Sequence, residues 1–358
     1  MGRLVLLDAT RTGRKLEDLQ NKIRSLVVGQ DEAVRAIVTA YQSHLVGLSP
    51  AGRPIGNFLF LGPTGSGKTR IVEATAQSLL NDPGAMIKID CAEYQHGHEI
   101  AKLVGSPPGY LGHRETHPLL SQDALDQHHT DKIKLSLVLF DEIEKASDAL
   151  WNLLLGILDK GILTLGDNRR VDFSESMVFL TSNLGAAEMC ALDGPRLGFS
   201  AAPKDGGFHG GKEAKMSRIG VTAARRKFTP EFINRLDKIV VFKPLGEKEL
   251  EKILDIELEM VEQRLQSAAA SEPFQLEVAE GARKLLLREG TDSTFGARHL
   301  KRAIERLLVQ PLSNLMASGQ IQRGDCIHVS RGDDSTSLLF LREAAWRDNW
   351  RVASSLAA

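Results

Sequence analysis

Residues 57–69, NFLFLGPTGSGKT, give the clearest indication of the fold. The apolar first half of this stretch is typical of a buried strand, and its second half matches the phosphate-loop pattern G-x-x-x-x-G-K-[ST]. In such a loop, backbone N–H groups wrap a pyrophosphate at a helix N-terminus. Lys68 is expected to reach the β- and γ-phosphates of ATP, and the Thr69 hydroxyl to bind Mg²⁺. The remaining nucleotide-binding candidates are the loop residues Pro63, Thr64, Gly65, Ser66 and Gly67.

An acidic pair follows a second apolar run, LVLFDE at 137–142. Alone, such a pair is more often a charge pair at a helix N-terminus. With a phosphate loop upstream, it favours a catalytic function. Asp141 suits the Mg²⁺ shell, and Glu142 suits orienting and deprotonating the attacking water.

Three further runs are predicted strands: AMIKID (85–90), SMVFLTSN (176–183) and KIVVF (238–242). Their alternation with helical patterns predicts an α/β fold, a parallel sheet with helices on both faces. We place a boundary near residue 243, followed by a smaller, mostly helical domain with a strand FQLEV and a strand pair near 325–341. The expected parts are an arm (1–25), the α/β domain (26–243), the small domain (244–341) and a tail (342–358) carrying Trp346 and Trp350.

Composition narrows the function. The chain has 358 residues and a net charge of −1, so no global field attracts nucleic acid or an anionic membrane. No stretch approaches the length of a membrane span, and a reducing, cytoplasmic location is expected. Three distant cysteines without C-x-x-C spacing favour free thiols and argue against a zinc site: Cys91, Cys190 and Cys326. Three histidines without ligand partners in the sequence are interpreted as solvated: His117, His128 and His129.

Two segments are rich in loop-forming residues. GSPPGYLGHRE (105–115) carries Tyr110 and Leu111 between glycines, and its aromatic ring either tucks onto the core or binds something. SAAPKDGGFHGGKEAK (200–215) is Gly-rich and polar, so a mobile loop is expected there.

Seven blocks together resemble the AAA+ module of the Clp family of protein unfoldases and disaggregases, most of all their second ATPase module. The resemblance spans roughly residues 20–330 in the family's order. The blocks are VVGQDEAV, RPIGNFLFLGPTGSGKT, GSPPGYLG, VLFDEIEKA, TSNLG, FTPEFINRLDKIVVF and FGARHLKRAIERL.

The resemblance implies roles that the residues alone leave open. Asn183 matches the first sensor, which helps to place the hydrolytic water, although a strand-end Asn can simply cap a turn. Arg235 matches an arginine finger that reaches a neighbour's nucleotide, and its alternative is a local pair with Asp237. Arg298 matches the second sensor, carried by the small domain; otherwise it is a solvated cation. Val27 and Val28 match a wall of the adenine pocket, or are simply core.

The resemblance also implies a ring, expected to be a hexamer, in which Tyr110 and Leu111 form a pore loop that grips polypeptide. The expected function is ATP-dependent pulling of protein through that pore. Leu197-Gly198-Phe199 resembles a tripeptide that docks unfoldases on a Clp-type peptidase, or packs back on its own domain.

Three alternatives stay open beside threading. The first is a remodeller dedicated to one protein complex. The second is a nucleic-acid motor or loader, which the near-neutral charge and the non-basic pore loop disfavour. The third is a non-hydrolysing scaffold, disfavoured because every catalytic position is filled.

Overall fold

The computed structural model describes residues 13–106, 117–193, 209–268, 275–291, 296–321, 324–332 and 336–343. The chain divides into two compact units, Met1–Pro244 and Leu245–Ala358. We call them the large and the small unit and describe each by itself.

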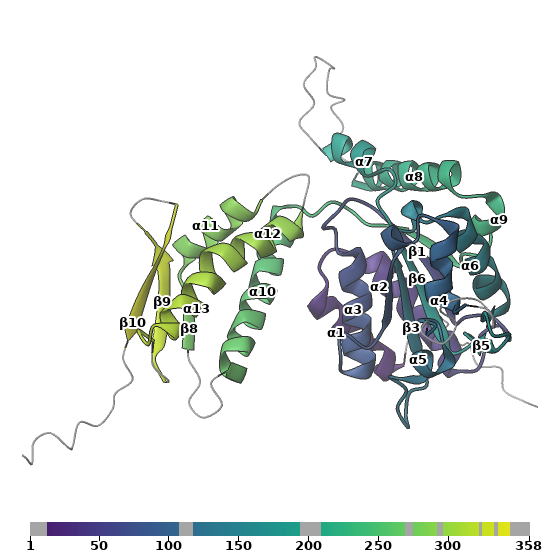
Figure 1. Ribbon diagram of the computed structural model, residues 1–358. Coiled ribbons are helices and arrows are strands. Elements are labelled where there is room, and N and C mark those ends of the chain that lie inside the picture. The colour runs from purple at the N-terminus through teal and green to yellow at the C-terminus, as the bar shows by residue number, and fades with distance from the viewer. Residues whose placement is uncertain are drawn as a thin grey trace, which may run out of the picture. The chain divides into compact units, whose positions relative to one another are not determined.

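A five-stranded sheet of parallel strands forms the centre of the large unit (Figure 1). Its order is β2-β3-β6-β1-β7, and every pairing between these neighbours is parallel. The central strands are buried along nearly their whole length, as expected for a parallel sheet covered on both faces. The predicted α/β fold class is therefore confirmed. The strands are β1 (Gly56–Leu61), β2 (Ile87–Asp90), β3 (Ser136–Asp141), β6 (Ser176–Ser182) and β7 (Lys238–Val241).

Two cores lie on opposite faces of this sheet, because successive side chains of a strand alternate between its faces. One core contains Phe58 and Phe60 of β1 and packs against helices α1 (Arg14–Leu26), α2 (Asp31–Leu45) and α3 (Lys68–Leu80). Phe58 stacks on Phe179 of β6 with ring centroids 5.3 Å apart. The other core contains Leu59 and Leu61 and packs against α6 (Asp148–Lys160) and the end of α8 (His209–Lys227).

Two segments differ from the sequence-based expectation. Residues 209–215 were expected in a mobile loop, but they form the start of α8, which continues through the buried Met216 and Ala224. Part of the expected arm is α1, whose buried Leu16, Leu19 and Ile23 join the core of the large unit. In both cases packing of apolar residues further along the helix outweighs the local polar or Gly-rich composition.

Short elements complete the large unit. A two-stranded antiparallel ribbon pairs β4 (Ile162–Thr164) with β5 (Arg170–Asp172). The short helices are α4 (Ala101–Val104), α5 (Gln122–Asp126), α7 (Ala186–Asp193) and α9 (Pro230–Ile233), with 3₁₀ turns at Cys91–Glu93, Gly97–Ile100 and Ile143–Lys145.

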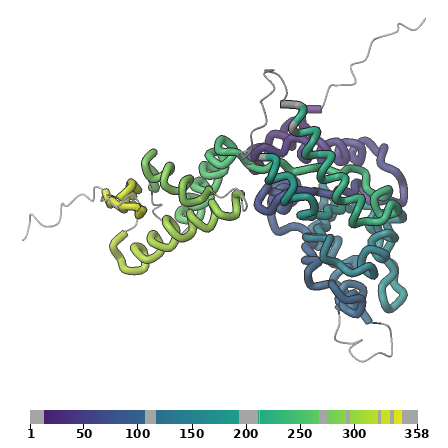
Figure 2. The backbone as a smooth tube through the Cα atoms, turned by 90° about the horizontal axis from the view of Figure 1, so that it is seen from above, coloured from purple at the N-terminus to yellow at the C-terminus, as the bar shows by residue number. Residues whose placement is uncertain are grey.

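The small unit combines helices with a three-stranded sheet of order β10-β9-β8. Figure 2 shows the yellow strands β9 and β10 to one side of the green helices. β8 and β9 are parallel, whereas β9 and β10 are antiparallel. The elements are α10 (Glu247–Ala268), β8 (Gln275–Val278), α11 (Glu280–Gly290), α12 (Ala297–Ile304), a π-helical turn (Glu305–Val309), α13 (Gln310–Ala317), β9 (Cys326–Arg331) and β10 (Leu338–Glu343).

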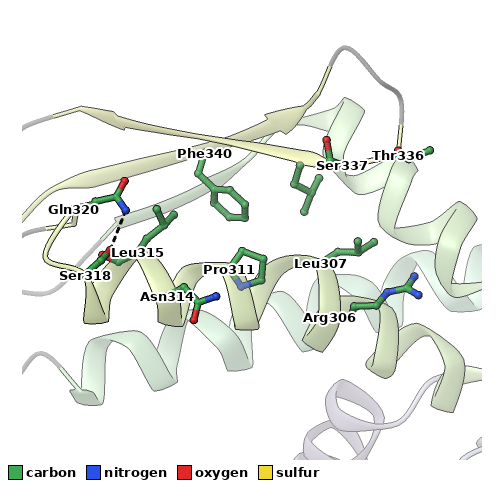
Figure 3. Close-up of a pocket in the computed structure, with 11 residues that line it drawn as sticks. Arg306, Leu307, Pro311, Asn314, Leu315, Ser318, Gln320, Thr336, Ser337 and Phe340 are labelled. Atoms are coloured by element: carbon green, nitrogen blue, oxygen red, sulfur yellow. Dashed lines mark hydrogen bonds between the residues drawn. The ribbon is translucent and has the colours of Figure 1, made fainter.

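The small sheet has an inner and an outer face. Ile327 and Val329 of β9 are buried in the small unit's core, and Phe340 of β10 packs against that core. Figure 3 shows Phe340 above Pro311 and Leu315 of α13, where these residues help to line a cavity of about 570 Å³. Cys326 and His328, which alternate with Ile327 and Val329 along β9, therefore lie on the outer face.

Candidate active site

The phosphate loop joins β1 to α3 at the carboxyl end of the strands. Gly62, Gly65 and Gly67 all have positive φ, at 149°, 76° and 98°. A Cβ added to Gly62 would meet the carbonyl oxygen of Phe242 at 2.7 Å. Only glycine fits this crossing, so the loop can turn tightly into the helix that starts at Lys68.

The Lys68 ammonium is held over this loop. Its Nζ donates to the carbonyl oxygens of Gly62 (2.7 Å) and Pro63 (2.9 Å) and to Oδ1 of Asn183 (2.8 Å). The side chain is buried, and the backbone turn supplies two of these three acceptors. The structure thus brings together Lys68 and Asn183, two predicted site residues 115 positions apart.

Asp141 lies at the end of β3, facing the start of α3. The Thr69 hydroxyl lies 3.4 Å from both carboxylate oxygens of Asp141, and Lys88 Nζ lies 3.5 Å from Oδ2. The Thr181 hydroxyl of β6 also donates to Asp141. A hydroxyl beside a carboxylate is a set of hard oxygen donors that suits Mg²⁺. Thr181 escaped the sequence analysis, although it lies two residues before Asn183 on the neighbouring strand.

Glu142 follows in a left-handed conformation, with φ 57°, which turns its side chain away from the line of β3. Its Oε1 accepts from Nδ2 of Asn183 at 3.2 Å, and its backbone N–H donates to Thr181 at 3.1 Å. Lys145 donates to the other carboxylate oxygen, and this hydrogen bond raises the pKa of Lys145. Glu142, the predicted water-activating residue, is thus hydrogen-bonded directly to Asn183, the predicted first sensor.

Glu144 is a second acidic residue that the sequence did not single out. Its Oε1 accepts from the backbone N–H of Asn183 at 3.0 Å and so fixes the residue that follows β6. Its Oε2 is buried and has no hydrogen-bond partner within the described part of the chain. The orientation of Asn183 is therefore set by two carboxylates, through its backbone and its side chain.

Gln30 joins three segments around the nucleotide-binding candidates. Its Nε2 donates to the carbonyl oxygens of Ser66 and Lys243, both at 3.1 Å, and its Oε1 accepts from the N–H of Lys243 at 3.3 Å. Val27 is buried in the core with α1 and α2, while Val28 is half-buried. Both valines directly precede Gly29 and Gln30, which line a cavity of about 420 Å³.

Arg235 lies at the amino end of the sheet strands, whereas the phosphate loop lies at their carboxyl end. Its carbonyl oxygen accepts from Nδ2 of Asn57, at the amino end of β1, at 3.1 Å. The loop begins five residues later, at Gly62, which at about 3.3 Å per residue is roughly 16 Å along the strand. The Arg235 side chain is therefore too far from Lys68 of the same chain for both cations to contact the phosphates of one bound nucleotide.

The predicted alternative partner of Arg235 is wrong. Nη1 of Arg235 donates to Asp159 of α6 at 2.6 Å, not to Asp237. Asp237 instead accepts from the backbone N–H of Asn57 at 2.8 Å and from Arg53 at 3.3 Å. Asp237 thus fastens the strand edge, while the guanidinium of Arg235 remains about one-third exposed.

Other expectations meet the structure unevenly. Arg298 lies exposed on α12 of the small unit. His129, interpreted as solvated, instead contacts Ser136 at 2.9 Å and Asp126 at 3.4 Å, because the turn before β3 folds it back.

Burial raises the pKa of the Cys91 thiol, helped by nearby Asp141, so this thiol stays protonated. Outside the described residues lie Tyr110, Leu111, Leu197, Gly198, Phe199, Trp346 and Trp350.

Within the described ranges, no helix has both the length and the apolar character needed to cross a membrane. The strand order, the phosphate loop after β1, the acidic pair after β3 and the polar end of β6 define the AAA+ class of P-loop ATPases.

Comparisons with known proteins agree. Residues 53–239 match the family model of the AAA domain (Cdc48 subfamily), and residues 245–329 match that of the C-terminal, D2-small domain of ClpB protein. The chain belongs to the Clp family of AAA+ ATPases, as the sequence motifs implied. This family membership makes it an ATPase and implies that it binds a nucleotide.

Several similar proteins are named as chaperones. The chain is 40% identical over 89% of its length to the chaperone protein ClpB of Meiothermus ruber and covers 34% of that protein. It is 36% identical to the probable chaperone protein ClpB 1 of Chlorobaculum tepidum, covering 69% of it. The Hsp104:casein complex of S. cerevisiae superposes with a TM-score of 0.76 at 30% identity, over 93% of this chain and 53% of that one. The chain spans about a third of the length of several curated ClpB relatives that it matches.

Proposed function

We propose that the chain is the motor unit of a homo-oligomeric ring that hydrolyses ATP and pulls polypeptide through a central pore. The observation that carries this proposal is the position of Arg235. The phosphate loop and Arg235 lie at opposite edges of one sheet, so the site of a single chain is incomplete. A neighbour in a ring, expected to be a hexamer, supplies the missing cation.

The oxygen donors and the cation at this site fit ATP with Mg²⁺. Thr69 and Asp141 provide hard oxygen ligands, and Lys68 is a cation whose three oxygen acceptors can be exchanged for phosphate oxygens. The metal ion would supply neutralisation of the charge on the phosphates. Arg298, on the small unit, is proposed as the second sensor, and Val27 and Val28 as part of the adenine wall.

In the proposed hydrolysis, water attacks the γ-phosphorus and its proton passes to the carboxylate of Glu142. The bond from phosphorus to the β,γ-bridging oxygen breaks, and ADP and phosphate leave. Asn183, which bonds Glu142 at 3.2 Å, holds the water-facing carboxylate in position. Lys145, bound to the other oxygen of Glu142, limits its rotation.

The coupling of hydrolysis to substrate is proposed to run through Tyr110 and Leu111. An aromatic ring between glycines offers apolar contact to any polypeptide without reading its sequence. The sequence motif and the family membership support this, and two similar solved structures are of Hsp104 with casein.

A folded reporter with a disordered tail tests the pore loop. We expect Tyr110→Ala to keep basal ATP turnover but to unfold little of the reporter, because the tyrosine side chain is proposed to contact substrate and not nucleotide. The matched control is Leu48→Ala, an exposed apolar residue 62 positions before Tyr110 in the sequence. Unfolding by Tyr110→Ala at the wild-type rate would contradict the assignment.

A peptidase partner is proposed from Leu197-Gly198-Phe199. Repetition of a small apolar anchor around a ring turns weak contacts into avidity. We expect a Clp-type peptidase from the same organism to degrade an unfolded protein in an ATP-dependent way, and Phe199→Ala to abolish degradation while ATPase activity remains. Absence of a complex at micromolar concentrations would leave remodelling without proteolysis.

A further inference from the structure

The outer face of the small sheet gathers a thiol, an imidazole and two carboxylates. Cys326 and His328 lie two residues apart on β9 and therefore point to the same face. Glu277 of β8 is the register partner of His328, and Glu343 of β10 is the register partner of Cys326. Three strands thus place these four side chains side by side, although they are up to 66 residues apart in sequence.

The imidazole of His328 lies between the two carboxylates. Its Nδ1 is 3.0 Å from Oε2 of Glu277, and its Nε2 is 3.1 Å from Oε2 of Glu343. Ligand atoms of Glu277, Cys326 and His328 all lie within 4.8 Å of one another. The cysteine spacing in the sequence argued against a zinc site, but the sheet supplies the proximity that the spacing lacks.

The distances suit a small adjustment to tetrahedral coordination. Bond lengths of about 2.0–2.3 Å from zinc to N, O and S ligands place neighbouring ligand atoms roughly 3.5 Å apart. The side chains of His328 and Glu277 are 38% and 66% exposed, so they can rotate to bring their ligand atoms closer together without disturbing the core. Glu343 on the far nitrogen resembles the carboxylate that commonly orients a metal-binding histidine.

We propose that Glu277, Cys326 and His328 form a binding site for a zinc-like divalent cation. His328 binds through Nδ1, on the Glu277 side, and Glu343 is a positioning residue that accepts the Nε2 hydrogen. The fourth coordination position faces solvent. Binding releases the thiol proton of Cys326, since only the thiolate is a metal ligand.

The site would fasten β10 to the rest of the small sheet. The ClpB small-domain match ends at residue 329, whereas β10 runs over Leu338–Glu343. All three ligands lie on β8 and β9, and the orienting carboxylate lies on β10, so the bound metal would tie β10 to the other two strands of the sheet. The competing explanation is a surface ion pair, in which a protonated His328 simply bridges two carboxylates.

Cobalt(II) added to the full chain without nucleotide or Mg²⁺ is the first test. A thiolate ligand gives a sulfur-to-cobalt charge-transfer band, which oxygen ligands such as those of Thr69 and Asp141 cannot produce. We expect this band to saturate at one equivalent, to vanish in Cys326→Ser and to persist in Cys190→Ser, the matched thiol control on α7. No band, or an unchanged band in Cys326→Ser, would overturn the site and leave an ion pair only.

Zinc affinity, measured by competition with a chromophoric chelator, tests the other residues. We expect His328→Ala and Glu277→Gln to lose high-affinity binding, and Glu343→Gln to weaken it by about 10–100-fold, the usual effect of an orienting carboxylate. Circular dichroism and basal ATP turnover should be unchanged, which shows that the variants fold. Wild-type zinc affinity in His328→Ala would overturn the site, and in Glu343→Gln it would overturn the positioning role.

Discussion

Lys68 and Glu142 have separable tasks in the proposed site, even though both contact Asn183. Lys68 Nζ donates to Asn183 at 2.8 Å, and Asn183 in turn donates to Glu142 at 3.2 Å. The amide of Asn183 therefore connects the proposed phosphate-binding cation to the proposed general base. Removing the cation should affect binding, whereas neutralising the base should affect the chemical step.

We expect Lys68→Ala to weaken ATP binding more than tenfold, because the β- and γ-phosphates lose their cation. Glu142→Gln should bind ATP with near wild-type affinity and lower kcat by about 10²–10⁴, the usual contribution of a general base. Fluorescent-nucleotide titration and phosphate release measure the two effects. The matched control is Glu93→Gln, an exposed carboxylate on the turn after β2. Near wild-type turnover in Glu142→Gln would refute the assignment.

The sequence could predict the residues whose role is written into a local pattern. The phosphate loop and the acidic pair are each short continuous motifs that follow apolar strands. Their residues could therefore be predicted from the sequence alone: Lys68, Thr69, Asp141 and Glu142. Gln30 could not be predicted, because its partners at Ser66 and Lys243 lie 36 and 213 positions away. Closeness in sequence also led to a wrong prediction, because Asp237 lies two residues from Arg235 but does not pair with it. The Asp237 carboxylate instead accepts hydrogen bonds from the backbone N–H of Asn57 and the side chain of Arg53.

Among the elements, β6 couples the core to the site. Its interior residue Phe179 is fully buried and stacks on Phe58, while its end carries Thr181 and leads into Asn183. The apolar part fixes the strand between β3 and β1, and the polar end then falls beside Asp141 and Glu142. The strand could be predicted from its apolar run. The contacts of its polar end depend on which strand lies beside it, and that order is not local information.

Phe179→Ala should destabilise the large unit by about 3–5 kcal/mol, the usual cost of deleting a buried aromatic ring. Equilibrium unfolding in urea, followed by hydrogen exchange in peptides of β1 and β6, measures the loss in this unit. Leu48→Ala, 78% exposed in the same unit, should change stability by no more than about 0.5 kcal/mol. A loss below about 1 kcal/mol for Phe179→Ala would mean that the aromatic stack does not hold the sheet together.

In the proposed ring, the amino and carboxyl ends of the strands of the large sheet would have different partners. The carboxyl edge carries the phosphate loop and Glu142, and the amino edge presents Arg235, whose guanidinium bonds Asp159 at 2.6 Å. In a ring, the amino edge of one chain would face the carboxyl edge of the next. The bond to Asp159 would hold the guanidinium in place until a neighbour's phosphates compete for it.

The most direct test mixes two inactive variants. Arg235→Ala alone should bind ATP and lose turnover by about 10³–10⁵, and Glu142→Gln alone should also be inactive. Mixed rings, shown to form by subunit exchange, should regain part of the ATP turnover, because an intact Arg235 from a Glu142→Gln subunit can then face an intact Glu142 in its neighbour. Recovery that follows the fraction of such pairs is the predicted result. No recovery at any mixing ratio in verified mixed rings would contradict the account.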